Sequence, residues 1–173
     1  MGILSNTVSI CQFRVMGDLP EGDLYQWSSD SLAENAFKSI DNTAQELSFG
    51  WVHVDDMEEG GFDTPRAFWR DNYSVFTLRR DQRKAPSVLV KAEMARAESE
   101  FLAKNPTFKR VPKGERDSLR DMVRASLFSR ILPSPTTYDA VWDRKRGIVT
   151  FTSLSPNAVD LFQDLFKKTF EGL

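Results

Sequence analysis

The spacing of apolar residues changes twice along this chain, and those changes limit the folds that it can adopt. Before residue 85, short apolar segments have the two-residue alternation or the β-branched composition of strands. After Ala85-Pro86, apolar residues recur every three or four positions, as on one face of a helix. Strand-like segments return after PSPTT at 133–137. We therefore expect an α+β chain in which a helical segment, 85–134, is inserted into a sheet core formed by 1–84 and 135–173.

The part before the insertion predicts the order strand, helix, strand, strand. The predicted strands are TVSICQFRV at 7–15, ELSFGWVHV at 46–54 and NYSVFTLRR at 72–80. The second strand alternates strictly, which predicts one shared face for Leu47, Phe49, Trp51 and His53. SLAENAFKSI at 31–40 predicts a helix, because Ser31 and Glu34 have the spacing of a capping box.

The inserted segment predicts two helices joined by a Pro-containing turn, an αα-hairpin. The first helix is indicated by Val90, Met94, Ala97 and Phe101, and it ends at the break KNPTFKRVPKG. The second begins at about Glu115, and its apolar stripe consists of Leu119, Met122, Val123 and Leu127.

The last part predicts a β-hairpin followed by a helix. TYDAVW and GIVTFTSL flank the turn DRKRG, in which Gly147 suits a position with positive φ. Ser155 and Pro156 have the pattern of a helix start. That helix would bury Ala158, Leu161, Phe162, Leu165, Phe166 and Phe170. The expected order is βαββ-αα-ββα, with a mainly antiparallel sheet covered by helices.

Charge is distributed unevenly along the chain, although the net charge is only −2. Residues 1–82 hold 6 basic and 14 acidic side chains, whereas 83–146 hold 15 basic and 8 acidic ones, a net of +7. Such asymmetry often marks a region that binds a polyanion, with nucleic acid the commonest partner. An ordinary solvated helix that is rich in Arg is the competing interpretation.

The candidate DNA contacts lie in and beside the predicted turn. Lys109, Arg110 and Lys113 have a single acidic neighbour, Glu115, within several residues. On the second helix, Arg116, Arg120 and Arg124 follow at four-residue steps beside the apolar stripe. Asp117 and Asp121 precede two of these arginines by three positions, so exposed ion pairs are the alternative interpretation there.

The same sequence offers little for catalysis, metal binding or a membrane. Cys11 and His53 are the single cysteine and histidine, which gives a zinc site or a Ser-His or Cys-His nucleophile no support. The acidic loop at 55–59 is interpreted as solvated, and His53 as packed or hydrogen-bonded. Asp143-Arg144-Lys145 is similar to the end of a nuclease motif, but a turn explains it equally well. We expect no enzyme activity, no metal or cofactor, and no membrane span, in a soluble cytoplasmic protein.

Five stretches in order resemble the bacterial recombination-associated protein RdgC family. They are NTVSICQFRV, Gly50-Trp51-Val52, TLRRDQRKAPSVLVKAEM, KGERDSLRDMVRASL and DRKRGIVTFTSLSPNAVDLFQDLFKKTFEGL. The resemblance implies a nucleoid-associated homodimer that encloses or clamps duplex DNA with little sequence preference and restrains recombinase filaments. It implies DNA contacts by Arg83, Lys84, Lys91, Lys113, Arg116, Arg120, Arg124 and Arg130.

The sequence departs from the family pattern in two places, just after the second helix and at the chain end. Phe128-Ser129-Arg130-Ile131-Leu132 stands where the family has Leu-Pro-Arg-Ala-Phe, so Phe128 and Leu132 are the candidate dimer contacts, with Leu132 replacing an aromatic residue. The sequence also ends at Leu173, without the C-terminal region of longer members. Two other functions remain open: a protein-interaction module that regulates a recombinase or nuclease with little DNA contact, and a metal-dependent nuclease.

Overall fold

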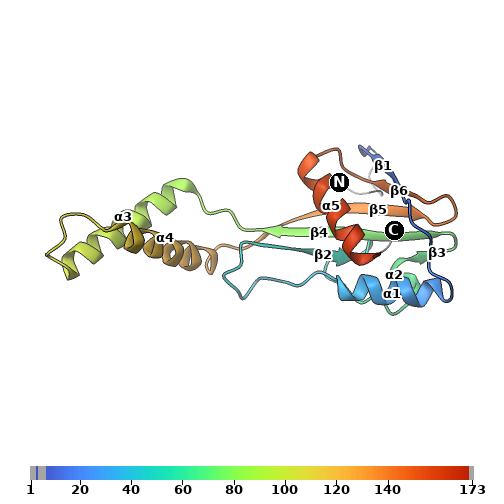
Figure 1. Ribbon diagram of the computed structural model, residues 1–173, viewed down its shortest axis with the longest axis horizontal. Coiled ribbons are helices and arrows are strands. Elements are labelled where there is room, and N and C mark those ends of the chain that lie inside the picture. The colour runs from blue at the N-terminus through green and yellow to red at the C-terminus, as the bar shows by residue number, and fades with distance from the viewer. Residues whose placement is uncertain (1–2, 4–6, 172–173) are drawn as a thin grey trace. The chain divides into compact units, whose positions relative to one another are not determined.

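The computed structural model describes residue 3 and residues 7–171, and within them the fold is α+β, as predicted (Figure 1). A six-stranded sheet is accompanied by five helices in the described part of the chain. The elements in chain order are β1 (Cys11–Arg14), α1 (Leu24–Glu34), β2 (Leu47–Val52), α2 (Pro65–Phe68), β3 (Trp69–Arg70), β4 (Tyr73–Gln82), α3 (Ser87–Lys104), α4 (Lys113–Phe128), β5 (Ser134–Asp143), β6 (Ile148–Phe151) and α5 (Pro156–Thr169).

The sheet has the strand order β1-β6-β5-β4-β2, and β3 pairs with β4. β5 and β6 are antiparallel neighbours, as the predicted hairpin requires, and β1 pairs with β6 in antiparallel register from Cys11↔Phe151 to Arg14↔Ile148. Gly147 has a φ of +65° in the turn between β5 and β6, which confirms the predicted positive φ. β1 is therefore one edge of the sheet.

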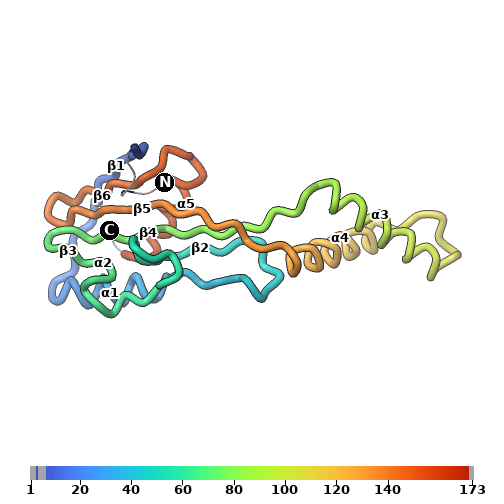
Figure 2. Tube along the Cα trace, turned by 180° about the vertical axis from the view of Figure 1, so that it is seen from behind, coloured from blue at the N-terminus to red at the C-terminus, as the bar shows by residue number. Residues whose placement is uncertain are grey.

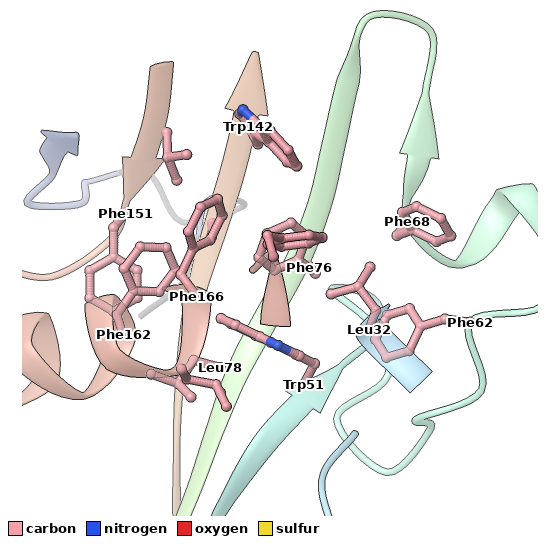
Figure 3. Close-up of a cluster of buried hydrophobic side chains, with 14 of the residues drawn as sticks. Leu32, Trp51, Phe62, Phe68, Phe76, Leu78, Trp142, Phe151, Phe162 and Phe166 are labelled. Carbon is pink, nitrogen blue, oxygen red and sulfur yellow. The ribbon is translucent and has the colours of Figure 1, made fainter. Parts of the chain in front are cut away.

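An aromatic core fills the space between the sheet and α5, which Figures 1 and 2 place against one face of the sheet from opposite viewpoints. The rings of Phe151 and Phe162 stack with centroids 4.2 Å apart, and Trp51 and Phe76 pack beside them (Figure 3). Burying each such side chain contributes roughly 1.5–3 kcal/mol. Trp51 also donates its Nε1–H to Thr169 Oγ1 at 2.7 Å, so its one polar group is satisfied.

The last helix follows its prediction closely. Ser155 is the N-cap and Pro156 is the first residue of α5, although the Ser155 side chain makes no capping hydrogen bond. Five of the six residues predicted to be buried are buried, and Leu161 is partly buried. The 3.6-residue pattern identified this helix because one complete face packs on the sheet.

The helix predicted at 31–40 is wrong. α1 runs from Leu24 to Glu34, and its N-cap is Asp23, whose carboxylate accepts a hydrogen bond from the backbone N–H of Gln26 at 3.1 Å. Beyond Asn35 the chain is extended, because the Phe37 N–H donates to the Trp51 carbonyl at 2.9 Å. Pairing with β2 ends the helix where the sequence pattern would continue it.

Gly50 makes that pairing sterically possible. A Cβ added at Gly50 would lie 2.5 Å from the Cα of Phe37, closer than Cβ atoms approach other atoms in real proteins. The chain 35–37 therefore runs beside β2, with Ala36 and Trp51 in a parallel bridge, at a position where only glycine fits.

The face that Leu47, Phe49 and Trp51 share by strand alternation is not buried along its whole length. Trp51 is buried, whereas Leu47 and Phe49 are 42% and 41% exposed, and His53 lies beyond the end of the strand. α2 and β3 were not predicted at all; they are short, and 69–70 pairs with 73–74 around a turn at Asp71, which has a φ of +51°.

Contacts divide the chain into two compact units, which we describe separately. Unit 1 comprises 1–38, 49–80 and 135–173 and contains the aromatic core. Unit 2 comprises 39–48 and 81–134 and contains α3 and α4. None of the helices in the described residues is both long and apolar enough to span a membrane.

Candidate nucleic-acid interface

Prolines position the two helices of unit 2. Pro86 precedes α3 and Pro112 precedes α4, and neither helix has a side-chain N-cap. A residue with φ fixed near −65° and no N–H fits a helix start, where the first N–H groups have no partner in the helix. α4 consequently begins at Lys113, two residues before the predicted start.

α3 and α4 pack against each other along an incomplete apolar seam. Phe101 and Leu119 are partly buried, and Leu127 is 3% exposed, but Met122 of the same predicted stripe is 67% exposed. A groove of about 330 Å³ lies between the helices and is lined by Ala97, Phe101, Leu119, Met122 and Val123, among others. The apolar stripe thus holds the helix pair together while part of it remains open to solvent.

Nine of the ten predicted DNA-binding side chains are exposed on unit 2. We call these nine the basic surface: Lys84, Lys91, Lys109, Arg110, Lys113, Arg116, Arg120, Arg124 and Arg130. Five of them make no hydrogen bond or ion pair with another described residue: Lys84, Lys91, Lys109, Arg110 and Lys113. Three of these five, Lys109, Arg110 and Lys113, lie at the turn between α3 and α4, and we call them the turn cations.

The arginines of α4 are engaged in ion pairs at the surface. Arg116 contacts Glu98 at 2.7 Å, Arg120 contacts Asp117 at 3.0 Å, and Arg124 contacts Glu46 at 2.8 Å. The sequence predicted a carboxylate partner for Arg124 at Asp121, but the partner is Glu46. Exposed pairs of this kind are worth roughly 0.2–1 kcal/mol, so an arriving phosphate can compete for these guanidinium groups.

Arg130 makes contacts within its own turn. Its Nη2 donates to Ser126 Oγ at 2.8 Å, and its Nε donates to the Ser126 carbonyl at 3.1 Å. The guanidinium is exposed, and both acceptors are neutral. These contacts therefore do not neutralise the positive charge of Arg130.

Arg83 is the exception among the predicted DNA contacts, and the structure overturns its assignment. The side chain is 1% exposed. Its guanidinium donates to the carbonyls of five residues at 2.6–2.9 Å, namely Ile40, Asp41, Thr43, Gln45 and Ile131. Every one of these bonds is made inside unit 2, so Arg83 ties the 39–48 segment to Ile131, just after α4, and cannot reach a phosphate.

Phe128 is likewise wrong as a dimer contact. It is 6% exposed, at the end of α4, and the guanidinium carbon of Arg124 lies 5.6 Å from its ring centroid. A buried ring inside one chain offers no surface to a second chain. Leu132, in contrast, is 82% exposed.

One exposed cation beside the basic surface was missed. Lys104, the last residue of α3, is exposed and makes no hydrogen bond or ion pair with another described residue. Its position directly before the turn could have identified it, because it lies within ten residues of all three turn cations.

The charge asymmetry is smaller when it is counted by compact unit than when it is counted along the sequence. Unit 2 holds 12 basic and 9 acidic side chains, a net of +3.

The acidic side chains of the loop at 55–59 in unit 1 make local contacts. Glu58 pairs with Arg79 at 2.7 Å, Glu59 accepts from the Gly61 N–H at 2.9 Å, and Asp56 accepts from the Glu58 N–H at 2.9 Å. Among the described residues, no group of three or more His, Cys, Asp and Glu side chains is placed to hold a metal ion. His53 packs on Phe62 and hydrogen-bonds the Gly61 carbonyl, as predicted.

The Asp143-Arg144-Lys145 sequence forms a turn with structural contacts. Asp143 accepts a hydrogen bond from the Arg146 N–H at 3.0 Å. Arg144 stacks on Trp69, with its guanidinium carbon 3.3 Å from the ring centroid, and donates to Ser74 and the Asp71 carbonyl. Burial lowers the pKa of Arg144, while Asp71 and Asp143 oppose that shift. These contacts fix the β5–β6 turn against β3.

The family to which the chain belongs follows from a comparison with family models. No curated protein matches this sequence. The family model described as "Putative exonuclease, RdgC" matches residues 13–173, which is nearly the whole sequence and includes both helices of unit 2. The chain therefore belongs to the RdgC family.

Proposed function

We propose that this protein binds DNA without sequence preference through the basic surface of unit 2, and that it acts in recombination as a nucleoid-associated homodimer. Membership of the RdgC family supports a recombination-associated role with DNA binding. The finer proposal is that the dimer encloses or clamps duplex DNA and so restrains the formation of recombinase filaments.

The observation that carries the proposal is the set of exposed cations on unit 2 that have no partner among the described residues. Lys84, Lys91, Lys109, Arg110 and Lys113 are exposed and have no partner among the described residues. Each cation that meets a phosphate releases condensed counterions, and that entropy favours binding at any sequence. Arg116, Arg120, Arg124 and Arg130 would add contacts by exchanging weak surface partners for phosphate oxygens.

The dimer is proposed from the family resemblance together with the exposure of Leu132. This side chain stands where the resembling sequences have an aromatic residue, and it is 82% exposed just after α4. An aliphatic residue there can still pack against its equivalent in a second chain, with a smaller buried area.

Charge reversal of the turn cations tests the DNA-binding surface directly. Lys109, Arg110 and Lys113 would all be changed to Glu, and the matched control would change the exposed Lys145, Lys167 and Lys168 of unit 1 in the same way. Both variants carry the same net charge, so any difference between them reports position. We expect the turn variant to bind a labelled duplex of mixed sequence about tenfold or more weakly, and the control to stay within about threefold.

The opposite result would favour the interaction-module alternative. If both variants bind the duplex as tightly as the parent, or lose affinity equally, the turn between α3 and α4 is not the DNA surface. The groove between these helices, with its exposed Met122, would then become the candidate contact for a recombinase or nuclease.

We further propose that DNA binding is not accompanied by cleavage, although the family description names an exonuclease. The acidic side chains at 55–59 and at Asp143 are engaged in turn and ion-pair contacts, and His53 is packed on Phe62. Hydrolysis of a phosphodiester needs a group that activates water and one that stabilises the leaving oxygen. A bound metal ion could supply both, but among the described residues no group of three or more His, Cys, Asp and Glu side chains is placed to hold one.

A further inference from the structure

We propose that the β1 edge of unit 1 binds an extended, acidic peptide segment of a partner protein, which adds to the sheet as a further strand. The inference concerns unit 1 alone and does not depend on the proposed DNA binding. Its elements are an open strand edge, an apolar pocket beside that edge, and two cations at the pocket.

The free edge presents backbone groups in a predictable pattern. The Val15 N–H donates to the carbonyl of Gly147, which lies directly opposite in the register that pairs Cys11 with Phe151. In an antiparallel pair, directly opposed residues alternate between bonded and non-bonded positions. The N–H and C=O of Gln12 and Arg14 therefore face away from β6, and no other strand in the described residues pairs with β1.

A pocket of about 250 Å³ lies beside this edge, between β1, β6 and α5. Its apolar walls are formed by Phe13, Val15, Val149, Phe162 and Phe166. A strand added to β1 would lie about 4.8 Å from it, and its residue opposite Phe13 would share the face on which Phe13 meets α5. Phe13 stacks on Phe162 at 5.7 Å, so this face leads into the pocket. The volume suits a single large apolar side chain.

The positive charge near the pocket indicates what kind of peptide would bind there. Arg14 and Lys167 line it, both are exposed, and neither has a hydrogen bond or ion pair with another described residue. No Asp or Glu is among the residues that line this pocket. Pairing of two β1 edges from two copies would bring like charges together, which is destabilising. A peptide in which acidic and apolar residues alternate instead pairs with the free backbone groups, places an apolar side chain at the pocket, and places its acidic side chains on the opposite face beside Arg14.

The probe for this site is a fluorescein-labelled peptide of sequence Glu-Val-Glu-Phe-Glu-Leu-Glu, followed by fluorescence polarisation. We expect Arg14→Glu to weaken its binding about five- to tenfold, because Arg14 lies on the face of β1 that the Glu residues of an added strand would share, so that an attraction becomes a repulsion. Lys168→Glu is the matched control, because it makes the same change of charge on unit 1 at an exposed residue that lies outside β1 and does not line the pocket. It should change binding less than about twofold.

Two further arms test the backbone contacts. Gln12→Pro removes an N–H that faces away from β6, so the β1–β6 pairing is kept and peptide binding should be lost. If circular dichroism shows that this variant is unfolded, a peptide N-methylated at alternate residues gives the same test on the parent protein, and it too should not bind.

Several results would overturn the proposal. They are saturable binding that is equal for Arg14→Glu and Lys168→Glu, equal binding of a peptide in which Lys replaces each Glu, or no polarisation change with any peptide. Self-association that Gln12→Pro abolishes, without peptide binding, would identify a second copy of the chain as the occupant and would equally overturn it.

Discussion

Arg83 shows how one residue type serves opposite purposes in unit 2. In the sequence it is one more cation in a basic stretch, adjacent to Lys84. In the structure its guanidinium is buried and bonded to five backbone carbonyls, whereas Lys84 is exposed. The planar fork of donors can satisfy several carbonyls of an irregular segment at once, which a lysine ammonium cannot do.

We expect Arg83→Met to destabilise the protein by about 3–5 kcal/mol, because it leaves buried carbonyls without donors. Denaturant titration measures the free energy of unfolding. Lys84→Met is the control, and as an exposed substitution it should change stability by less than about 0.5 kcal/mol. Equal stability of the two variants would contradict the role assigned to Arg83.

Gly50 provides a second prediction at this scale. Gly50→Ala places a Cβ 2.5 Å from the Phe37 backbone, so it should destabilise by about 2 kcal/mol or more, since the backbone must separate there. Gly114→Ala in α4 meets nothing within 4 Å and should instead stabilise by about 0.5–1 kcal/mol. Thermal melting of both variants would show shifts of opposite sign; a common sign would refute the close approach at Gly50.

The spacing of apolar residues predicted the elements that pack one complete face against the rest of the protein. It failed where pairing with a distant strand overrides a local signal. α5 was predictable because Ser155-Pro156 marks its start and its apolar residues all meet the sheet. α1 was not, because a capping-box spacing at Ser31 competed with the true cap at Asp23, and because 35–37 pairs with β2. Pairing between segments that are far apart in the sequence produces no periodic pattern of apolar residues that could predict it.

The candidate site was predictable to a similar extent. Exposed cations at the turn follow from their isolation in a polar, Pro-containing segment, as for Lys109 and Arg110. Burial of Arg83 did not follow, because it depends on 39–48 and 81–134 belonging to one unit. No local pattern in either segment indicates that association.

The next prediction concerns the packing of the helix α4. Leu127→Ala should destabilise by about 2–5 kcal/mol, because Leu127 is 3% exposed and its loss leaves a cavity. Met122→Ala, from the same apolar stripe but 67% exposed, should cost less than about 0.5 kcal/mol. Urea titration of the two variants measures both values. Similar losses at the two positions would mean that the stripe is not divided into a buried and an open part.

For the whole molecule, we propose that unit 2 binds DNA and that no cleavage accompanies this binding. Linear and nicked DNA incubated with excess protein and magnesium or manganese should therefore remain intact on a denaturing gel. Asp143→Asn is the informative variant, because Asp143 caps the β5–β6 turn. Degradation by the parent protein that this variant lacks would show that the turn is a nuclease site.

The central claim is that binding to DNA is electrostatic and independent of sequence, and its most direct test is the salt dependence of the association constant. If four to six cations of the basic surface meet phosphates, log K for duplex DNA should fall linearly with log salt at a slope of about −4 to −5. Duplexes of unrelated sequence should give the same line. A flat response to salt, or strong preference for one sequence, would contradict the claim.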